Sequence, residues 1–195
     1  MKRLLLSVSL GASALIPAAA QAQALPAAVV AVVDVDRVRT TCNACRTAIA
    51  TLQSQATAQE NREKTLSAPL QTEGQSIQTA INALNGKEPD AALKTRAQTF
   101  QTKLQQAQEE AARGRQQLQA NQQYIVKQID DKLNPIFQQV MQRRGANVLI
   151  EQGTTLATSS TIDVTNDVLA ALNSSLTTIA TTAPAPARTN QPQGR

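Results

Sequence analysis

Two runs of apolar residues, spaced alternately four and three apart, dominate the chain. The earlier, looser run comprises Ile49, Leu52, Ala56, Gln59, Glu63, Leu66, Leu70, Glu73, Ile77, Ala80 and Leu84. The later run comprises Leu93, Ala97, Phe100, Leu104, Ala107, Ala111, Gly114, Leu118, Asn121 and Ile125. In this later run only Gly114 and Asn121 are not apolar. The four-three alternation averages the 3.5-residue period of a coiled-coil seam, so each run predicts one long helix.

A short turn separates the two runs. Residues 85–90 read Asn-Gly-Lys-Glu-Pro-Asp, a combination that ends one helix and starts another. The pattern predicts helices over residues 42–84 and 90–133. With so short a connection the helices must run antiparallel, so residues 41–133 are expected to form a helical hairpin, or arm.

Prolines and a change of spacing interrupt this regular picture. Pro69 lies inside the first helix and predicts a bend near residues 65–70. Pro135 is expected to end the second helix, with a further helical piece over residues 136–144. After the seam ends, apolar residues continue at a different spacing, at Ile129, Leu133, Ile136 and Val140. This change of period predicts a local loss of supercoiling.

The segments that flank the arm have the composition of strands. Residues 27–35 are rich in Val and predict a strand buried on both faces. Residues 36–41 are expected to be its exit, with Thr40 or Thr41 capping the first arm helix.

Beyond the arm the sequence predicts more strands and one short helix. Residues 148–150 and 155–158 predict two strands of a β-hairpin that turns at Gly153. Thr165 is expected to cap a helix over residues 166–173. The predicted fold is α+β, mainly α: a long helical hairpin inserted in a small β body, formed by residues 27–40 and 134–175.

The two ends of the chain read differently from the rest. Lys2 and Arg3 precede a short apolar stretch and two Ala-Gln-Ala cleavage sites, so residues 1–24 predict a secretory signal peptide cleaved near residues 22–24. An uncleaved anchor is the alternative. Residues 181–195 consist largely of Thr, Ala, Pro, Gln and Arg and predict a disordered tail.

Composition argues against several classes of function. The chain has no His, which removes the commonest general base and metal ligand, and it shows no phosphate-binding loop. No enzyme activity, metal or cofactor is therefore expected. One Tyr, two Phe and no Trp leave little for stacking on nucleic acid. The formal charge of +5 is mildly basic and favours acidic partners or an anionic membrane surface.

Cys42 and Cys45 lie three residues apart at the expected start of a helix. Side chains at this spacing share a helix face and are close enough for a disulfide. A helix N-terminus also lowers the pKa of a thiol, which would suit a redox-active pair. Three interpretations remain open: a local structural disulfide, a redox-active pair, and free or inter-subunit thiols.

Three segments resemble the Skp/OmpH family of periplasmic chaperones. Residues 31–38 (AVVDVDRV) are similar to the opening strand of the family, and residues 145–151 (GANVLIE) to its second strand. Residues 162–169 (IDVTNDVL) are similar to the segment that enters its last helix. The resemblance covers about residues 27–175, and the adjacent Cys pair departs from the family pattern.

The resemblance implies a periplasmic homotrimer with a β-barrel core and helical arms around a cavity. It implies an ATP-independent holdase that binds unfolded outer-membrane proteins, with lipopolysaccharide as a further candidate partner. Basic residues on the arm are candidates for client contact: Lys87, Lys94, Arg96, Lys103, Arg113 and Arg115. The alternatives are a structural coiled-coil or adaptor protein of the cell envelope and a thiol redox protein that uses Cys42 and Cys45.

Overall fold

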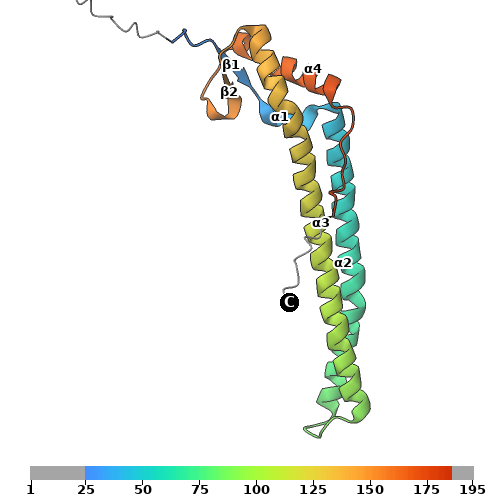
Figure 1. Ribbon diagram of the computed structural model, residues 1–195. Helices are drawn as coiled ribbons and strands as arrows, with labels where there is room; N and C mark the ends of the chain where they lie inside the picture. Colours follow the sequence, from blue (N-terminus) through green and yellow to red (C-terminus); the bar gives the residue numbers. More distant parts are fainter. Residues whose placement is uncertain (1–24, 186–195) are drawn as a thin grey trace, which may run out of the picture.

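A long helical hairpin extends from a small body in the computed structural model of the chain, which describes residues 25–185 (Figure 1). The predicted signal peptide, residues 1–24, and residues 186–195 of the predicted tail lie outside this range. The described part is mainly helical with one small sheet, as the sequence predicts.

The arm is formed by α2 (Asn43–Ala83, 41 residues) and α3 (Ala91–Arg144, 54 residues), which pack antiparallel. At 1.5 Å per residue, α2 is roughly 60 Å long. The connecting turn uses left-handed backbone at Asn85 (φ 48°) and Gly86 (φ 86°). Asp90 caps α3 by accepting a hydrogen bond from the Leu93 N–H at 2.8 Å. The predicted hairpin is therefore confirmed.

Both arm helices continue through their prolines. Helix α2 is unbroken at Pro69, and α3 is unbroken at Pro135, so the predicted end of the second helix near residue 133 is wrong. An interior proline costs about 3 kcal/mol. On either side of Pro135, Leu133 (1 % exposed) and Ile136 (4 % exposed) are buried in the core. Burial of two such side chains contributes about 3–6 kcal/mol, which is enough to offset the cost of the proline.

The change of apolar spacing marks the point where α3 leaves the arm and enters the body. Beyond the arm, α3 buries Ile125, Ile129, Leu133, Ile136 and Val140. They form one core with residues of β1, α1, the start of α2 and α4. A helix that packs against several elements keeps no strict 3.5-residue period, because its buried face is no longer a two-helix seam.

The predicted first strand is too long, and its expected exit is a helix. Strand β1 spans only Val30–Val33, and α1 follows at Val35–Thr41. Asp34 caps α1 by accepting from the Arg37 N–H at 2.8 Å. Neither Thr40 nor Thr41 caps α2; the Sγ atom of Cys42 accepts from the Cys45 N–H at 3.0 Å instead.

The sheet has two strands, and they are parallel. Strand β2 (Val148–Glu151) pairs with β1 in the register Val30 to Val148 through Val33 to Glu151. The arm is thus the crossover that parallel strands require. The predicted β-hairpin is wrong: residues 155–158 form no strand, and they lie between the 3₁₀ turns η1 (Gln152–Thr154) and η2 (Ser160–Ile162).

Helix α4 spans Thr165–Ser175, so the predicted short helix is confirmed but its predicted cap is not. The Thr165 hydroxyl oxygen accepts a hydrogen bond from the Asp34 N–H at 2.9 Å and so ties α4 to the end of β1. Hydrogen bonds from the Thr165 side chain and backbone lower the pKa of Asp163, assisted by the charge of Arg37. This junction holds the start of α1 against the start of α4.

After α4 the chain returns along the arm. Residues 176–185, which we call the strap, have no regular secondary structure and lie beside α2 and α3, where Figure 1 draws them in dark red. Side-chain amides of the arm bind the strap at Ala180, Thr181 and Ala183. The predicted disorder from residue 181 is therefore wrong as far as residue 185. The contacts that hold this segment come from distant residues of the arm, and the sequence alone did not show them.

Candidate functional site: the helical arm

The seam positions predicted from the sequence face the partner helix, but most are only half-buried. On α3 every seam residue from Leu93 to Leu118 is half-buried apart from Leu104, which is 38 % exposed. On α2 the exceptions are Ile49, which is exposed, and Ile77, which is buried. Two helices cover each seam residue from one side only, so part of its apolar surface remains accessible.

In the middle of the arm this accessible surface forms an open groove of about 770 Å³ between α2 and α3. Its apolar lining consists of Leu66, Leu70, Gly74, Phe100, Leu104, Ala107 and Ala111. Its polar lining consists of Glu60, Glu63, Lys64, Ser67, Gln71, Gln75, Gln108 and Arg115. An apolar floor with a polar rim is typical of a surface that binds another molecule.

Two glycines allow close contacts beside this groove. A Cβ at Gly74 would lie 3.0 Å from Cζ of Phe100, so the ring packs directly on the backbone of α2. At Gly114 a Cβ would overlap the side-chain amide of Gln59. Gln59 therefore lies across α3, where its Nε2 donates to the Ala111 carbonyl oxygen at 3.4 Å.

The same glutamine sets the charge at the body end of the groove. Gln59 Nε2 also donates to Glu63 Oε1 at 3.0 Å, and Arg115 forms an ion pair with Glu63 at 2.9 Å. The hydrogen bond from Gln59, followed by the charge of Arg115, lowers the pKa of Glu63. The Glu63 carboxylate is therefore ionised at neutral pH.

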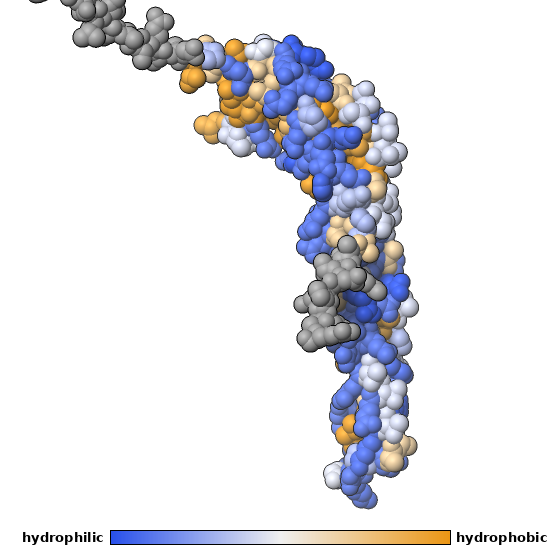
Figure 2. Space-filling model, viewed as in Figure 1, coloured by the Kyte–Doolittle hydropathy of each residue, from blue (hydrophilic) through white to orange (hydrophobic). Residues whose placement is uncertain are grey.

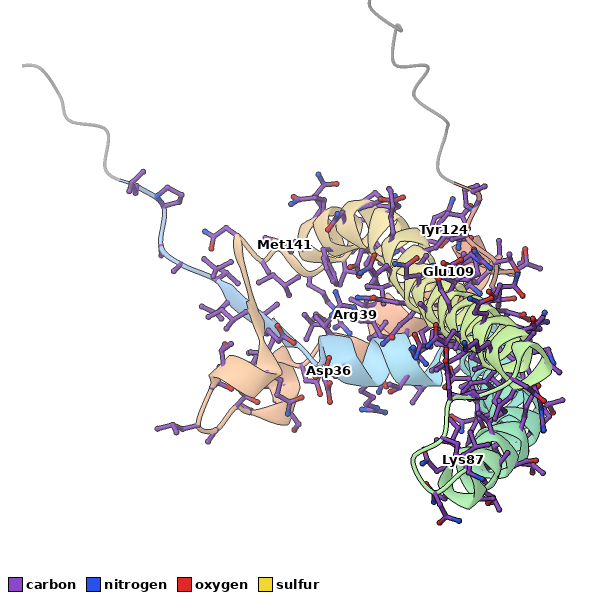
Figure 3. All side chains as sticks on the ribbon, turned by 90° about the horizontal axis from the view of Figure 1, so that it is seen from below. Asp36, Arg39, Lys87, Glu109, Tyr124 and Met141 are labelled. Atoms are coloured by element: carbon purple, nitrogen blue, oxygen red, sulfur yellow. A yellow bond between two sulfur atoms is a disulfide. The ribbon has the colours of Figure 1, made fainter. Side chains whose placement is uncertain are left out.

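Most of the basic residues singled out from the sequence have local partners. Four form ion pairs: Lys94 with Glu88, Lys103 with Glu73, Arg113 with Glu109, and Arg115 with Glu63. Arg96 donates to Ser76 Oγ at 2.9 Å. Among the described residues no ion pair is found for Lys87, which lies in the turn at the far end of the hairpin (Figure 3). Of these residues, only Arg115 lines the groove.

Cys42 and Cys45 are joined in a disulfide at the junction of α1 and α2, with their Cα atoms 5.0 Å apart. Both residues are 0 % exposed and belong to the body core. Thiol–disulfide exchange requires an attacking thiolate to reach a sulfur atom. Complete burial therefore argues against a redox-active pair and favours the structural interpretation.

Apolar side chains also gather on the body, away from the arm. Leu25, Val29, Val148 and Leu156 are all exposed near the two-stranded sheet, and Figure 2 shows hydrophobic residues concentrated at this end. Strands β1 and β2 pair with each other, and β1 gains one further bridge, from Val32 to Asp163. A two-stranded sheet with exposed apolar residues is marginal on its own and favours association.

Sequence reasoning missed the polar contacts between the arm and the strap. Asn121 interrupts the apolar seam and is 5 % exposed, and its side chain contacts both Gln55 and the strap. A polar residue at a seam position was the available signal, because such residues need a specific partner. Gln55, Gln117 and Gln128 carried no such signal among the many glutamines of the chain.

Neither a membrane-spanning helix nor a metal-binding cluster is found among residues 25–185. No helix in this range is long and apolar enough to cross a membrane. Within the same residues no cluster of three or more His, Cys, Asp or Glu side chains is placed to hold a metal ion.

Comparison with known proteins relates the arm and body to a family. Residues 29–172 match the model of a family described as outer membrane protein (OmpH-like). The chain is also similar to the crystal structure of a candidate outer membrane chaperone (OmpH-like) from Caulobacter crescentus CB15, with a TM-score of 0.68 and 19 % identity. That alignment covers 84 % of this chain and 95 % of the other, which shows a shared fold. A comparison with curated proteins finds no match.

Proposed function

Because the chain belongs to the OmpH-like outer membrane protein family, we propose that it is an ATP-independent holdase chaperone. Its clients are unfolded outer-membrane proteins, which it binds in the periplasm and keeps from aggregating. It carries out no catalysis in this role. The proposal extends the family assignment with the surface chemistry of the arm.

The observation that carries the proposal is the open groove in the middle of the arm. Its floor is apolar but shallow, since Leu104 is exposed and Leu70 and Phe100 are half-buried. Apolar burial contributes about 25 cal/mol per Å², so partial contacts of this kind are individually weak. Many weak apolar contacts suit a client that must be held unfolded and later released.

Charge supports the same interpretation without dominating it. The arm's basic residues are mostly in exposed ion pairs, and such pairs contribute about 0–1 kcal/mol each. A basic residue of the arm can therefore leave its carboxylate partner on the arm and pair with an acidic group of a client at little cost in free energy. Lys87, Lys94, Arg96, Lys103, Arg113 and Arg115 supply this adjustable charge, and the same residues suit anionic lipid or lipopolysaccharide.

Self-association through the body is the second part of the proposal. The exposed apolar residues near β1 and β2 are best covered by another copy of the chain, and the family resemblance implies a homotrimer with a β-barrel core. Light scattering of the purified mature protein should give about three times the mass of one chain. A monomer at micromolar concentration would contradict this part alone.

The holdase proposal is tested by diluting a urea-unfolded β-barrel protein into buffer and following turbidity. The wild-type protein should suppress aggregation at near one trimer per client. Substitution of two groove residues, Leu70→Gln with Leu104→Gln, should reduce suppression several-fold. The matched control is Ile81→Gln with Val126→Gln, which changes two exposed apolar residues outside the groove and should leave suppression unchanged.

The outcomes separate the alternatives. No suppression by the wild-type protein, even at several-fold excess, would overturn the holdase proposal and favour an envelope adaptor. An adaptor should bind one folded partner and show no preference for unfolded chains. Equal loss in the groove variant and the control would show that the groove is not the site of binding.

A further inference from the structure

The strap lies along the arm without regular secondary structure and has one bend, at Thr182. Its first part is anchored in the body, where Leu176 is buried and Ile179 packs against the core. Beyond that anchor, exposure alternates: residues 179, 181 and 183 are half-buried, whereas residues 180, 182 and 184 are exposed. This period of two is that of a β-strand with one face on a surface.

Four side-chain amides on α2 and α3 bind the strap, and we call them the amide track: Gln55, Gln117, Asn121 and Gln128. Gln128 makes a paired contact with Ala180, accepting from its N–H at 3.0 Å and donating to its carbonyl oxygen at 2.8 Å. The Gln128 side chain thus bonds both the N–H and the carbonyl oxygen of Ala180, as the backbone of a neighbouring β-strand would.

Asn121 is the centre of the track. Its Oδ1 accepts from the Ala183 N–H at 2.8 Å and from Gln117 Nε2 at 2.8 Å. Its Nδ2 donates to Gln55 Oε1 at 2.9 Å, and Gln55 Nε2 in turn donates to the Thr181 carbonyl oxygen at 3.2 Å. These linked amides form a built polar site, because each one is oriented by the next.

Every hydrogen bond between the track and the strap uses main-chain atoms of the strap. Over the described residues the hydroxyl groups of the strap threonines make no hydrogen bond to the arm. Recognition of this kind depends on main-chain donors and acceptors and not on a particular sequence. A segment of another chain with the same shape satisfies the same contacts.

We infer that the amide track is a binding site for one extended segment of an unfolded client, and that the strap is its internal occupant. This inference rests on the proposed function. Strands of outer-membrane barrels are extended and present successive side chains to opposite faces, and the strap likewise alternates in exposure over residues 179–184. The surface beside the track is lined by Gln55, Gln59, Gly114 and Asn121 and shares no residue with the mid-arm groove, so it is a second, separate surface of the arm.

The test uses the full chain with the strap released. Ala180→Pro with Ala183→Pro removes the two N–H groups that donate to Gln128 and Asn121. The control, Thr178→Pro with Thr182→Pro, removes N–H groups of two exposed residues that make no such bond among the described residues. The probe is a fluorescent peptide with the sequence of residues 176–185, followed by anisotropy.

The strap-release variant should bind the peptide at least tenfold more tightly than the wild type or the control variant. Adding Asn121→Leu or Gln128→Leu should reverse this gain, whereas Gln122→Leu, on an exposed part of α3, should not. Two track variants are included so that a folding defect in one leaves the other informative. No gain in the strap-release variant would overturn the track as a peptide site.

A urea-diluted β-barrel protein should then displace the bound peptide. If aggregation is suppressed but the peptide stays bound, the client part of the inference is wrong while the holdase proposal stands. If no aggregation is suppressed, the holdase proposal itself fails. Displacement by a folded, soluble protein at the same concentration would also overturn selectivity for unfolded chains.

Discussion

The buried disulfide offers the sharpest test of how the body is stabilised. Cys42 is the single residue between α1 and α2, and Cys45 lies in the first turn of α2, so their bond cross-links the junction of the two helices. Both residues belong to the same core as Leu133 and Leu172. Replacement of both by Ala removes the cross-link and two buried sulfur atoms without introducing a polar group.

The expected loss is worked from two contributions. A cross-link that closes so short a loop stabilises the fold by about 2 kcal/mol in the chain-entropy model. Removal of each buried sulfur, comparable in size to a methyl group, costs about 1 kcal/mol. The Ala double variant should therefore lose about 4 kcal/mol, equivalent to about 10 °C in melting temperature for a chain of this size.

Circular dichroism melts of three samples check this reasoning. The oxidised wild type, the wild type unfolded and refolded with a reductant, and the Ala double variant should melt in descending order. The reduced wild type keeps both sulfur atoms, so it isolates the contribution of the cross-link. A double variant that melts within 2 °C of the oxidised protein would refute the argument. Rapid reduction of the native disulfide would contradict its burial and restore the thiol-exchange alternative.

The remaining predictions concern the core, a glycine contact and acid stability. Leu133→Ala should destabilise the protein by about 2–5 kcal/mol in denaturant titration, whereas Leu104→Ala, at an exposed seam position, should cost under about 1 kcal/mol. Gly114→Ala should change the melting temperature little, because about 1 kcal/mol of helix propensity offsets the displaced Gln59 amide. The lowered pKa of Asp163 stabilises the fold above its unfolded value of 3.8, and this contribution is lost as the pH falls through the folded pKa. Asp163→Asn should therefore be less stable than the wild type at pH 6, and the difference should shrink below pH 4.

The hairpin could be predicted because its signals are local. Seam spacing and the turn over residues 85–90 each act within a few residues, and both appear in the structure. The spacing of Cys42 and Cys45 allowed a local disulfide for the same reason, but it left two other interpretations open until the structure placed both residues in the core. Local patterns state where a helix starts and which face is apolar, and they determine most of the arm.

The errors lie where distant segments decide the outcome. Pro135 was expected to end a helix, but Leu133 and Ile136 beside it are buried in a core that α3 shares with distant segments, α4 among them. Residues 155–158 were expected to pair with β2, whose partner is β1 on the other side of the arm. The strap was expected to be disordered, but its contacts come from α2 and α3. In each of these three cases a local sequence rule was applied where a contact between distant segments determines the structure.

The residues that stabilise the arm and the residues proposed to bind clients lie at different levels along it. Between the body core and the turn, Ile77 and Asn121 are the buried side chains of the described arm, and the groove lies between their levels. The strap and the disulfide both act at the body end, where they hold α2 to α1 and to α3. Because the half-buried groove residues contribute little to the core, changes at Leu70 or Leu104 should alter client binding before they alter folding. The same shallow burial that weakens the seam as a coiled coil leaves its apolar surface available to a client.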